Sequence, residues 1–226
     1  MFNIEVDVFP FFKTLASLPK AKLLGLLFFC AFVAVFIAIA FALGLGWLTD
    51  MLAYWDTAWL NTLSGWVTGL LGGVVAWFML PTLVVLIAGV FQETVISRVE
   101  KIYYPDRQRT SPPQLWPDIV HDIRFTLRAI LLNLLIVPFY FFGIGFFLSV
   151  ALNSYLLGRE FFESAAGYHL GKKQAQAFGR EFRGPIYLGG LVITLATLVP
   201  GVNMITPVLA VVWMTHLYHF LCTREK

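Results

Sequence analysis

The chain has 226 residues, of which 59% are hydrophobic and only 13% are charged. Soluble domains carry about 25% charged residues, so this composition and a mean hydropathy of +0.78 exclude a soluble globular domain and predict an integral membrane protein. The net charge of +3 and the absence of a basic face interleaved with aromatic residues argue against a nucleic-acid partner. The two cysteines, Cys30 and Cys222, are far apart in the sequence and give neither a disulfide framework nor a metal-binding spacing.

The first apolar segment follows Lys13, Lys20 and Lys22 and contains 27 residues without charge, residues 23–49. This pattern resembles a signal peptide, with Ala38-Ile39-Ala40 as its cleavage site. The uncharged run is too long for the apolar part of a signal peptide, however. It therefore favours a retained transmembrane helix over residues 23–49, since about 20 residues cross a bilayer.

The second apolar segment covers residues 57–92 and again contains no charged residue. Its first part carries Trp59 and Trp66, and tryptophan is enriched at membrane–water interfaces. We expect this part to lie at the interface and to lead into a second crossing over residues 67–92, kinked at Pro81.

A polar stretch then leads to apolar residues at every fourth position, which predicts an amphipathic helix over residues 114–128. Two further apolar runs follow, at residues 129–158 and 184–223, and a charged helix is predicted between them at residues 159–183. We predict that the four hydrophobic runs and their connections form a single membrane domain covering residues 1–226.

Lysine or arginine is present in every polar segment except the connection between the first two crossings, residues 50–56. The positive-inside rule therefore places every later polar segment on the side where the chain began. Each later apolar run must then enter and leave the bilayer by the same face. A run of 30 residues folded in half gives arms of about 22 Å, which is shorter than the bilayer core of about 30 Å. We predict two helical hairpins, of which at least the first is only partly inserted.

Helix-breaking residues lie in the middle of both hairpins. The first contains Pro138 followed by Gly143-Ile144-Gly145, and the second contains Pro200-Gly201 and Pro207. A hairpin tip places the N-terminus of the returning helix inside the membrane, where its N–H groups can bind an anion. The candidate ligands are Gly143 and Gly145 in the first tip and Gly201, Asn203 and Thr206 in the second. The alternative is that these residues only turn the chain.

Small residues recur at helix-packing spacing in both crossings, as Gly65, Gly69 and Gly73 and as Ala38, Ala42 and Gly46. Such faces allow helices to approach closely in lipid. Packing within one chain and packing between copies of the chain remain equally open at this point.

Charged residues next to the apolar runs are the candidates for lining a path through the membrane, since an ionisable group at membrane depth is expensive to keep there. They are Glu93, Arg128, Arg159 and Glu160. The sequence contains no motif for an enzyme or for ATP binding, and we expect no cofactor. His216 and His219 are three residues apart and have no neighbouring carboxylate or cysteine in the sequence, so a structural role is favoured over a metal site.

The order of these segments resembles the CysZ-type sulfate permease family of bacterial inner membranes. The resemblance covers the chain from about Phe11 to Phe220 and is strongest in LVPGVNMITP at residues 198–207 and in residues 152–163, with Tyr155, Arg159 and Glu160. It implies a multi-pass protein of the bacterial inner membrane that imports sulfate for cysteine biosynthesis and works as a homo-oligomer.

The family usually carries a glycine–hydrophobic–arginine stretch before its first long helix, which is tied to anion binding. Here the corresponding residues are Pro19-Lys20-Ala21-Lys22. The resemblance therefore implies that Lys20 and Lys22 contact the anion, as point charges without the bidentate geometry of arginine.

Together these observations predict an all-α membrane protein with two long transmembrane helices, two partly inserted proline-broken hairpins and amphipathic interfacial helices. Its predicted function is sulfate transport that is channel-like or coupled to an ion and is not driven by ATP. The alternative is a scaffold or membrane-shaping protein whose hairpins are inserted in one leaflet.

The predicted topology is testable by cysteine labelling. With both native cysteines replaced, single cysteines at Asp56 and Ser111 should react with an impermeant reagent from opposite sides of the membrane. Labelling of both positions from the same side contradicts the two-crossing topology.

Overall fold

The computed structural model describes residues 10–52, 57–109, 115–199 and 201–224. Within these ranges every regular element is an α-helix or a 3₁₀-helix, and no strand is present. The all-α fold class predicted from the sequence is therefore confirmed. The chain forms two compact units, one of residues 1–24 and 91–226 and the other of residues 25–90.

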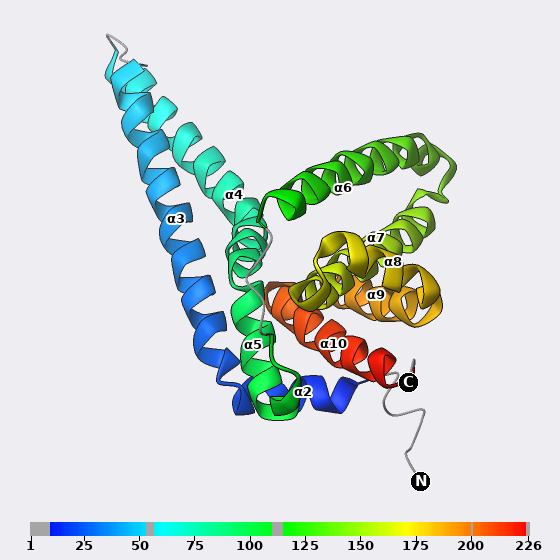
Figure 1. Cartoon of the computed structure of the whole chain (residues 1–226). Helices are drawn as coiled ribbons and strands as arrows, with labels where there is room; N and C mark the ends of the chain where they lie inside the picture. The colour runs from blue at the N-terminus through cyan, green and yellow to red at the C-terminus, as the bar shows by residue number, and fades with distance from the viewer. Residues whose placement is uncertain (1–9, 53–56, 110–114, 200, 225–226) are drawn as a thin grey trace. The chain divides into compact units, whose positions relative to one another are not determined.

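Two long helices make up the second unit. They are α3, Leu23–Leu52, and α4, Ala58–Val90, and they run alongside each other (Figure 1). At 1.5 Å per residue these 30-residue and 33-residue helices are about 45 and 50 Å long, which exceeds the thickness of the bilayer core. Helix α4 begins before the crossing predicted at residues 67–92, and Trp59 and Trp66 are exposed on its first turns.

The first unit contains the remaining helices and both hairpins. Its elements in chain order are α2, Phe11–Lys20; α5, Gln92–Tyr103; η1, Pro105–Arg107; α6, Leu115–Ile136; η2, Val137–Phe142; α7, Gly145–Leu170; α8, Lys172–Glu181; α9, Arg183–Thr197; and α10, Val202–Arg224.

The two predicted hairpin tips coincide with breaks in helical structure. Helices α6 and α7 are joined by η2 and by Gly143, whose φ of +74° is left-handed. A Cβ at Gly145 would lie 2.6 Å from Tyr140, so the chain can turn back here only with glycine. Helices α9 and α10 are joined by a turn that ends at Gly201, with a φ of +82°, whereas Pro200 lies outside the described residues.

Two predicted helix boundaries are wrong. The amphipathic helix and the first arm of hairpin 1 form one continuous helix, α6, because nothing between Arg128 and Ala129 breaks a helix. The charged helix predicted at residues 159–183 is divided at Gly171, whose φ is +77°, between the end of α7 and the whole of α8. A change from charged to apolar residues marks a change of environment along the chain. It does not by itself end a helix, because the backbone hydrogen bonds continue across it.

Pro207 does not break the second hairpin, in contrast to the prediction. It lies inside α10, which continues to Arg224. The hydroxyl of Thr206 donates a hydrogen bond to the carbonyl oxygen of Val202 at 2.8 Å. Pro207 leaves the carbonyl oxygen of Asn203 without its usual helical donor, and a loss of one such bond is tolerated in membrane helices where other groups can satisfy the carbonyl.

Helices α7 and α9 cross through two glycines, Gly158 and Gly190. A Cβ on Gly158 would lie 2.6 Å from the carbonyl oxygen of Ile186, and a Cβ on Gly190 would lie 2.7 Å from the Cα of Gly158. The two backbones are therefore in direct contact. On the other side of α9, a Cβ on Gly189 would lie 2.9 Å from the Cε of Met214 in α10, so α9 is held tightly between two helices.

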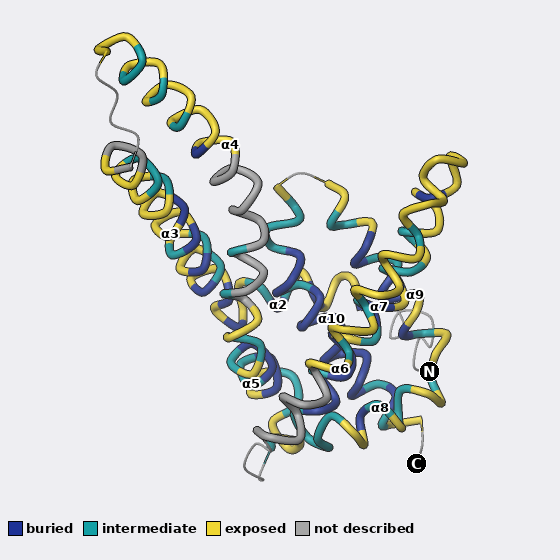
Figure 2. The backbone as a smooth tube through the Cα atoms, turned by 90° about the horizontal axis from the view of Figure 1, so that it is seen from above, coloured by how far each residue is buried: buried dark blue, intermediate teal, exposed yellow. Residues whose placement is uncertain are grey.

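Helix α10 forms the centre of the first unit and α6 lies on its surface (Figure 2). Residues Ala210–Tyr218 of α10 are all buried, and this helix packs against α2, α5, α7 and α9. In contrast, none of the residues of α6 and η2 from Ile123 to Phe142 is buried. An apolar helix without protein around it requires lipid or another apolar partner.

Three segments among the described residues are long and apolar enough to cross a membrane: Leu23–Leu48, Ile123–Phe142 and Val202–Arg224. The second and third belong to the hairpins. Helix α10, with 23 residues, is about 34 Å long and could cross the bilayer core by itself, whereas α9, with 15 residues, is about 22 Å long and could not.

The glycine stripe of α4 is not used for packing between the described parts of this chain. A Cβ added to Gly65, Gly69 or Gly73 would meet no atom within 4 Å. The neighbouring Gly72 instead faces Leu45 of α3, at 3.9 Å. Contact of the stripe with a second copy of the chain remains a prediction.

The glycine crossing is testable with a matched pair of substitutions in α9. Gly190→Ala should lower the free energy of unfolding by about 1–3 kcal/mol, because the new methyl group overlaps the backbone of α7. Gly184→Ala should be neutral or stabilising by about 0.5–1 kcal/mol, since its Cβ has open space in the same helix. Thermal unfolding in detergent, followed by circular dichroism, measures both, and equal effects would contradict the close crossing.

Candidate functional site

An arginine-rich cavity of about 540 Å³ lies between α7, α8 and α9. We call it the arginine cavity. Its charged lining residues are Arg159, Arg180, Arg183 and Glu163, so it carries two more positive than negative charges. Tyr155, Tyr187 and Gln176 add polar groups to its wall, and Gly179, Gly184, Phe162 and Ile186 complete it.

Arg159, which the sequence analysis selected, is held firmly in this wall. Its Nε donates a hydrogen bond to Glu163 Oε1 at 2.5 Å, and its Nη1 donates to the hydroxyl of Tyr155 at 3.4 Å. Burial alone would lower the pKa of Arg159, but the hydrogen bond and negative charge of Glu163 outweigh it and raise that pKa. The guanidinium therefore stays charged, in a fixed position over the ring of Phe125 at 5.3 Å.

The other two arginines of the cavity have more freedom. Arg180 donates only a long hydrogen bond, of 3.4 Å, to Gln176 Oε1. Neither Arg180 nor Arg183 forms an ion pair within the described parts of the chain. Both guanidinium groups are thus available to an anion that enters the cavity.

Lys20 and Lys22 lie at the junction between α2 and α3, away from the arginine cavity. Lys22 has a positive φ of 52°, and its carbonyl oxygen accepts a hydrogen bond of 3.2 Å from Arg98 of α5. The ammonium group of Lys20 lies 5.9 Å from the centre of the Tyr103 ring. The fold therefore brings Arg98 to the two lysines, although it lies 76 positions from Lys22 in the sequence.

The remaining charged candidates are dispersed over the first unit. Glu93 is exposed at the start of α5 and forms a long ion pair of 3.8 Å with Arg109. Arg128 is exposed on α6. Glu160 does not line the arginine cavity but a different hollow, with Asn133 and Tyr140. These three do not lie at one site.

The second hairpin tip is built mainly as a turn. Gly201 supplies the left-handed backbone, and the hydroxyl of Thr206 is used by its own helix. Asn203 is half-buried, and its Oδ1 has no hydrogen-bond partner among the described residues. Of the three predicted ligands at this tip, only Asn203 retains a polar side-chain atom for another group.

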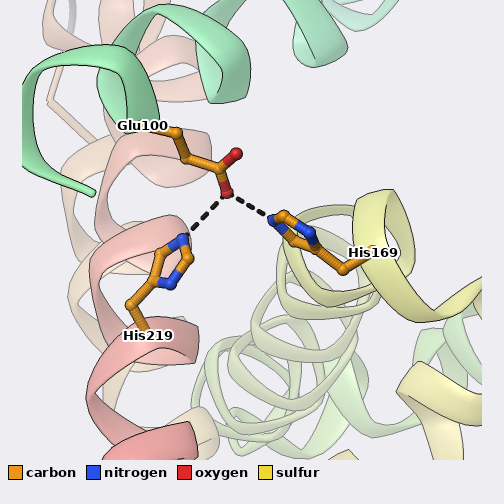
Figure 3. A group of neighbouring side chains, drawn as sticks. All are labelled: Glu100, His169 and His219. Carbon is orange, nitrogen blue, oxygen red and sulfur yellow. Dashed lines mark hydrogen bonds and ion pairs between the residues drawn. The ribbon is translucent and has the colours of Figure 1, made fainter. Parts of the chain in front are cut away.

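A buried cluster of one carboxylate and two histidines was not predicted from the sequence. Glu100 Oε1 accepts hydrogen bonds from His169 Nε2 at 2.6 Å and from His219 Nε2 at 2.8 Å (Figure 3). Glu100 is 1% exposed and His219 is 2% exposed. Burial alone would raise the pKa of Glu100, but the two histidines outweigh it and hold that pKa below its ordinary value.

His216 extends this polar interior toward α2 and does not join the cluster itself. Its Nε2 lies 3.1 Å from the Ser17 hydroxyl, and its Nδ1 lies 2.9 Å from the Tyr104 hydroxyl. The Tyr104 ring stacks on His219 with 3.9 Å between the ring centres. The histidines that the sequence presents as a pair thus have different partners.

A second cavity, of about 640 Å³, adjoins these histidines. Its lining contains His216, His219, Tyr103 and Tyr104 together with Lys13, Asp106, Arg107 and Arg224. Arg107 donates a hydrogen bond of 3.3 Å to the carbonyl oxygen of His219. The polar interior is therefore accessible from a positively charged opening.

These additional residues carry little signal in the sequence. Glu100, His169 and His219 are separated by 69 and 50 positions and come from three helices. Arg98 lies 76 positions from its partner Lys22. The only usable hint is that Glu100 and His169 are polar residues next to apolar ones in the last turns of α5 and α7.

A model of the protein family described as "Sulfate transporter CysZ/Etoposide-induced protein 2.4" matches residues 10–207. The chain belongs to this family. The match runs from the start of α2 through Pro207 in α10 and so includes the arginine cavity, Glu100 and His169. It confirms the family resemblance found in the sequence and supports an anion transporter in a lipid environment. No curated protein and no solved structure matches the chain.

The buried cluster should stabilise the first unit. Glu100→Gln leaves the buried imidazole of His219 and the half-buried imidazole of His169 without their carboxylate. It should lower the free energy of unfolding by about 3–5 kcal/mol. Glu93→Gln, in the same helix, removes an exposed carboxylate and should change it by about 1 kcal/mol or less. Chemical unfolding in detergent compares the two, and a Glu100→Gln variant as stable as Glu93→Gln would refute the structural importance of the cluster.

Proposed function

We propose that the protein transports sulfate and that the arginine cavity binds the anion. The observation that carries this proposal is the position of three guanidinium groups around one cavity with a single carboxylate. The family match supports the same substrate class. In cells the activity would be import across the bacterial inner membrane for cysteine biosynthesis, by a homo-oligomer that needs no cofactor.

The chemistry of sulfate suits this lining. Sulfate is a strongly hydrated dianion, and a protein that removes its water must replace it with N–H and O–H donors and positive charge. Guanidinium groups bind such oxyanions in a bidentate way. In the arginine cavity Arg180 and Arg183 can do so, and the hydroxyl groups of Tyr155 and Tyr187 are additional donors.

Arg159 serves a different role from the other two arginines in this proposal. Without a bound anion, its charge is neutralised by the ion pair with Glu163. Arg159 therefore contributes an oriented dipole and a fixed side chain to the cavity lining. Attraction of the anion falls to Arg180 and Arg183. The excess of two positive charges matches the charge of one sulfate ion.

The junction of α2 and α3 would serve as an entry point for the anion. Lys20, Lys22 and Arg98 concentrate positive charge there, and such a field raises the local concentration of anions. Of the predicted path residues, Glu93, Arg128 and Glu160 are assigned no contact with sulfate, whereas Asn203 at the second hairpin tip remains a possible ligand deeper in the membrane.

One observation favours a second candidate function. The apolar segment Ile123–Phe142 has no buried residue, and such a hairpin inserted in one leaflet would act as a wedge. A non-transporting scaffold or membrane-shaping protein would use it in this way.

Flux of radiolabelled sulfate into proteoliposomes tests the transport function. The wild-type protein should carry sulfate above the rate of empty vesicles. The double variant Arg180→Gln/Arg183→Gln should lower the flux by about tenfold or more, because a hydrogen bond to a charged group contributes about 1.5–3 kcal/mol.

Arg128→Gln is the control, since it removes one exposed arginine that lies outside both cavities. It should keep the flux within about twofold of the wild type, given the small effect of an exposed charge. Flux equal to that of empty vesicles would overturn transport and favour the scaffold. Normal flux in the double variant would overturn the arginine cavity as the site.

A further inference from the structure

The cluster of Glu100, His169 and His219 has the composition of a metal site. Its three ligand atoms come from α5, α7 and α10 and all lie within 4.8 Å of one another. Both histidines direct Nε2 at the same carboxylate oxygen (Figure 3). Two imidazoles and one carboxylate form the same protein ligand set that holds zinc in several hydrolytic enzymes.

We propose that Glu100, His169 and His219 bind one divalent first-row transition-metal ion of the zinc type. Imidazole nitrogen selects such ions over Mg²⁺ and Ca²⁺, which prefer sites made of oxygen ligands. The site is separate from the arginine cavity, whose lining contains none of the three residues. The inference therefore does not depend on sulfate transport.

The distances fit an ion after a small adjustment. Tetrahedral zinc with bonds of about 2.0–2.1 Å requires ligand atoms about 3.3 Å apart. The carboxylate oxygen is now 2.6 Å from His169 Nε2 and 2.8 Å from His219 Nε2. These two pairs must separate by about 0.5–0.7 Å, and the two Nε2 atoms, which lie within 4.8 Å of each other, must also come to about 3.3 Å. Rotation of the three side chains can supply these changes without movement of a helix.

The environment of the cluster also suits a bound cation. Glu100 is 1% exposed and carries a negative charge in the protein interior, where charge is expensive unless it is compensated. A divalent ion would compensate this charge more completely than the two imidazole hydrogen bonds alone. With three protein ligands, a fourth coordination position would remain for water or another donor.

Aromatic rings hold the two histidines in orientation. Tyr104 stacks on His219 with 3.9 Å between ring centres, and Tyr218 stacks on His169 at 5.5 Å. Rings that are already oriented lose little freedom when they bind a metal, and such preorganisation increases affinity.

The ion would reach the cluster through the cavity beside His219. Lys13, Arg107 and Arg224 make this opening positive, and only Asp106 opposes them in its lining. Repulsion lowers the local concentration of a dication there. We therefore expect slow loading, and a titration should be equilibrated for hours.

Metal binding to the full chain is the direct test. The protein is purified in detergent with a tag that contains no histidine, stripped with a chelator, and equilibrated with Zn²⁺ alone. We expect about one zinc per chain by atomic emission, and a thermal midpoint raised by about 3 °C or more, because a ligand that binds only the folded state stabilises it. Co²⁺ in place of zinc should show the visible absorption of a four-coordinate ion.

His169→Gln and His216→Gln form the matched pair. His169 is at the partly exposed end of α7, and a glutamine there keeps an N–H donor for Glu100, so the fold should be retained. The replacement should weaken Zn²⁺ binding by about 100-fold and remove the Co²⁺ band. His216 is one turn from His219 in α10 but binds Ser17 and Tyr104 instead, and the His216→Gln variant should bind Zn²⁺ within about threefold of the wild type.

Two results would overturn the metal site. One is a wild-type protein that retains no zinc or cobalt after equilibration at a large excess of the ion. The other is binding that survives in His169→Gln unchanged. Since sulfate flux is measured separately on the arginine variants, loss of either activity leaves the other assignment intact.

Discussion

The direct contact between the backbones of α7 and α9 determines how the two hairpins are joined. Gly158 and Gly190 leave no space for a side chain at this crossing. Lipid does not drive apolar helices together as water does, so close backbone packing must provide the attraction. Because Arg159 directly follows Gly158, the same crossing brings it to one cavity with Arg183 and Tyr187 of α9.

The first unit buries several polar side chains within its mainly apolar interior and exposes many large apolar side chains, unlike a soluble domain. Helix α2 shows this most clearly, since Ser17 is buried against His216 whereas Phe12 is 78% exposed. A buried polar group is tolerated only when it is paired. The hydrogen bonds that join Glu100 and the histidines therefore hold α2, α5, α7 and α10 around one centre.

Local patterns in the sequence predicted the all-α class and the positions of the two breaks in helical structure, but not every helix boundary. Glycine at positions 143 and 201 has the left-handed backbone that a tight turn requires. Pro207 does not end its helix, because a proline near the start of a helix removes a single backbone hydrogen bond and the rest of α10 remains intact. Of the predicted charged candidates only Arg159 lies in a cavity with other arginines.

The sequence by itself determined the membrane class, the all-α fold and the family, because length, hydropathy and charge act along the chain and can be counted there. Only the tertiary structure decided which polar residues meet. Arg98 with Lys22, and Glu100 with His169 and His219, are far apart in the sequence. Their proximity depends on helix crossings such as that of Gly158 with Gly190, and no local periodicity encodes which glycine of one helix faces which glycine of another.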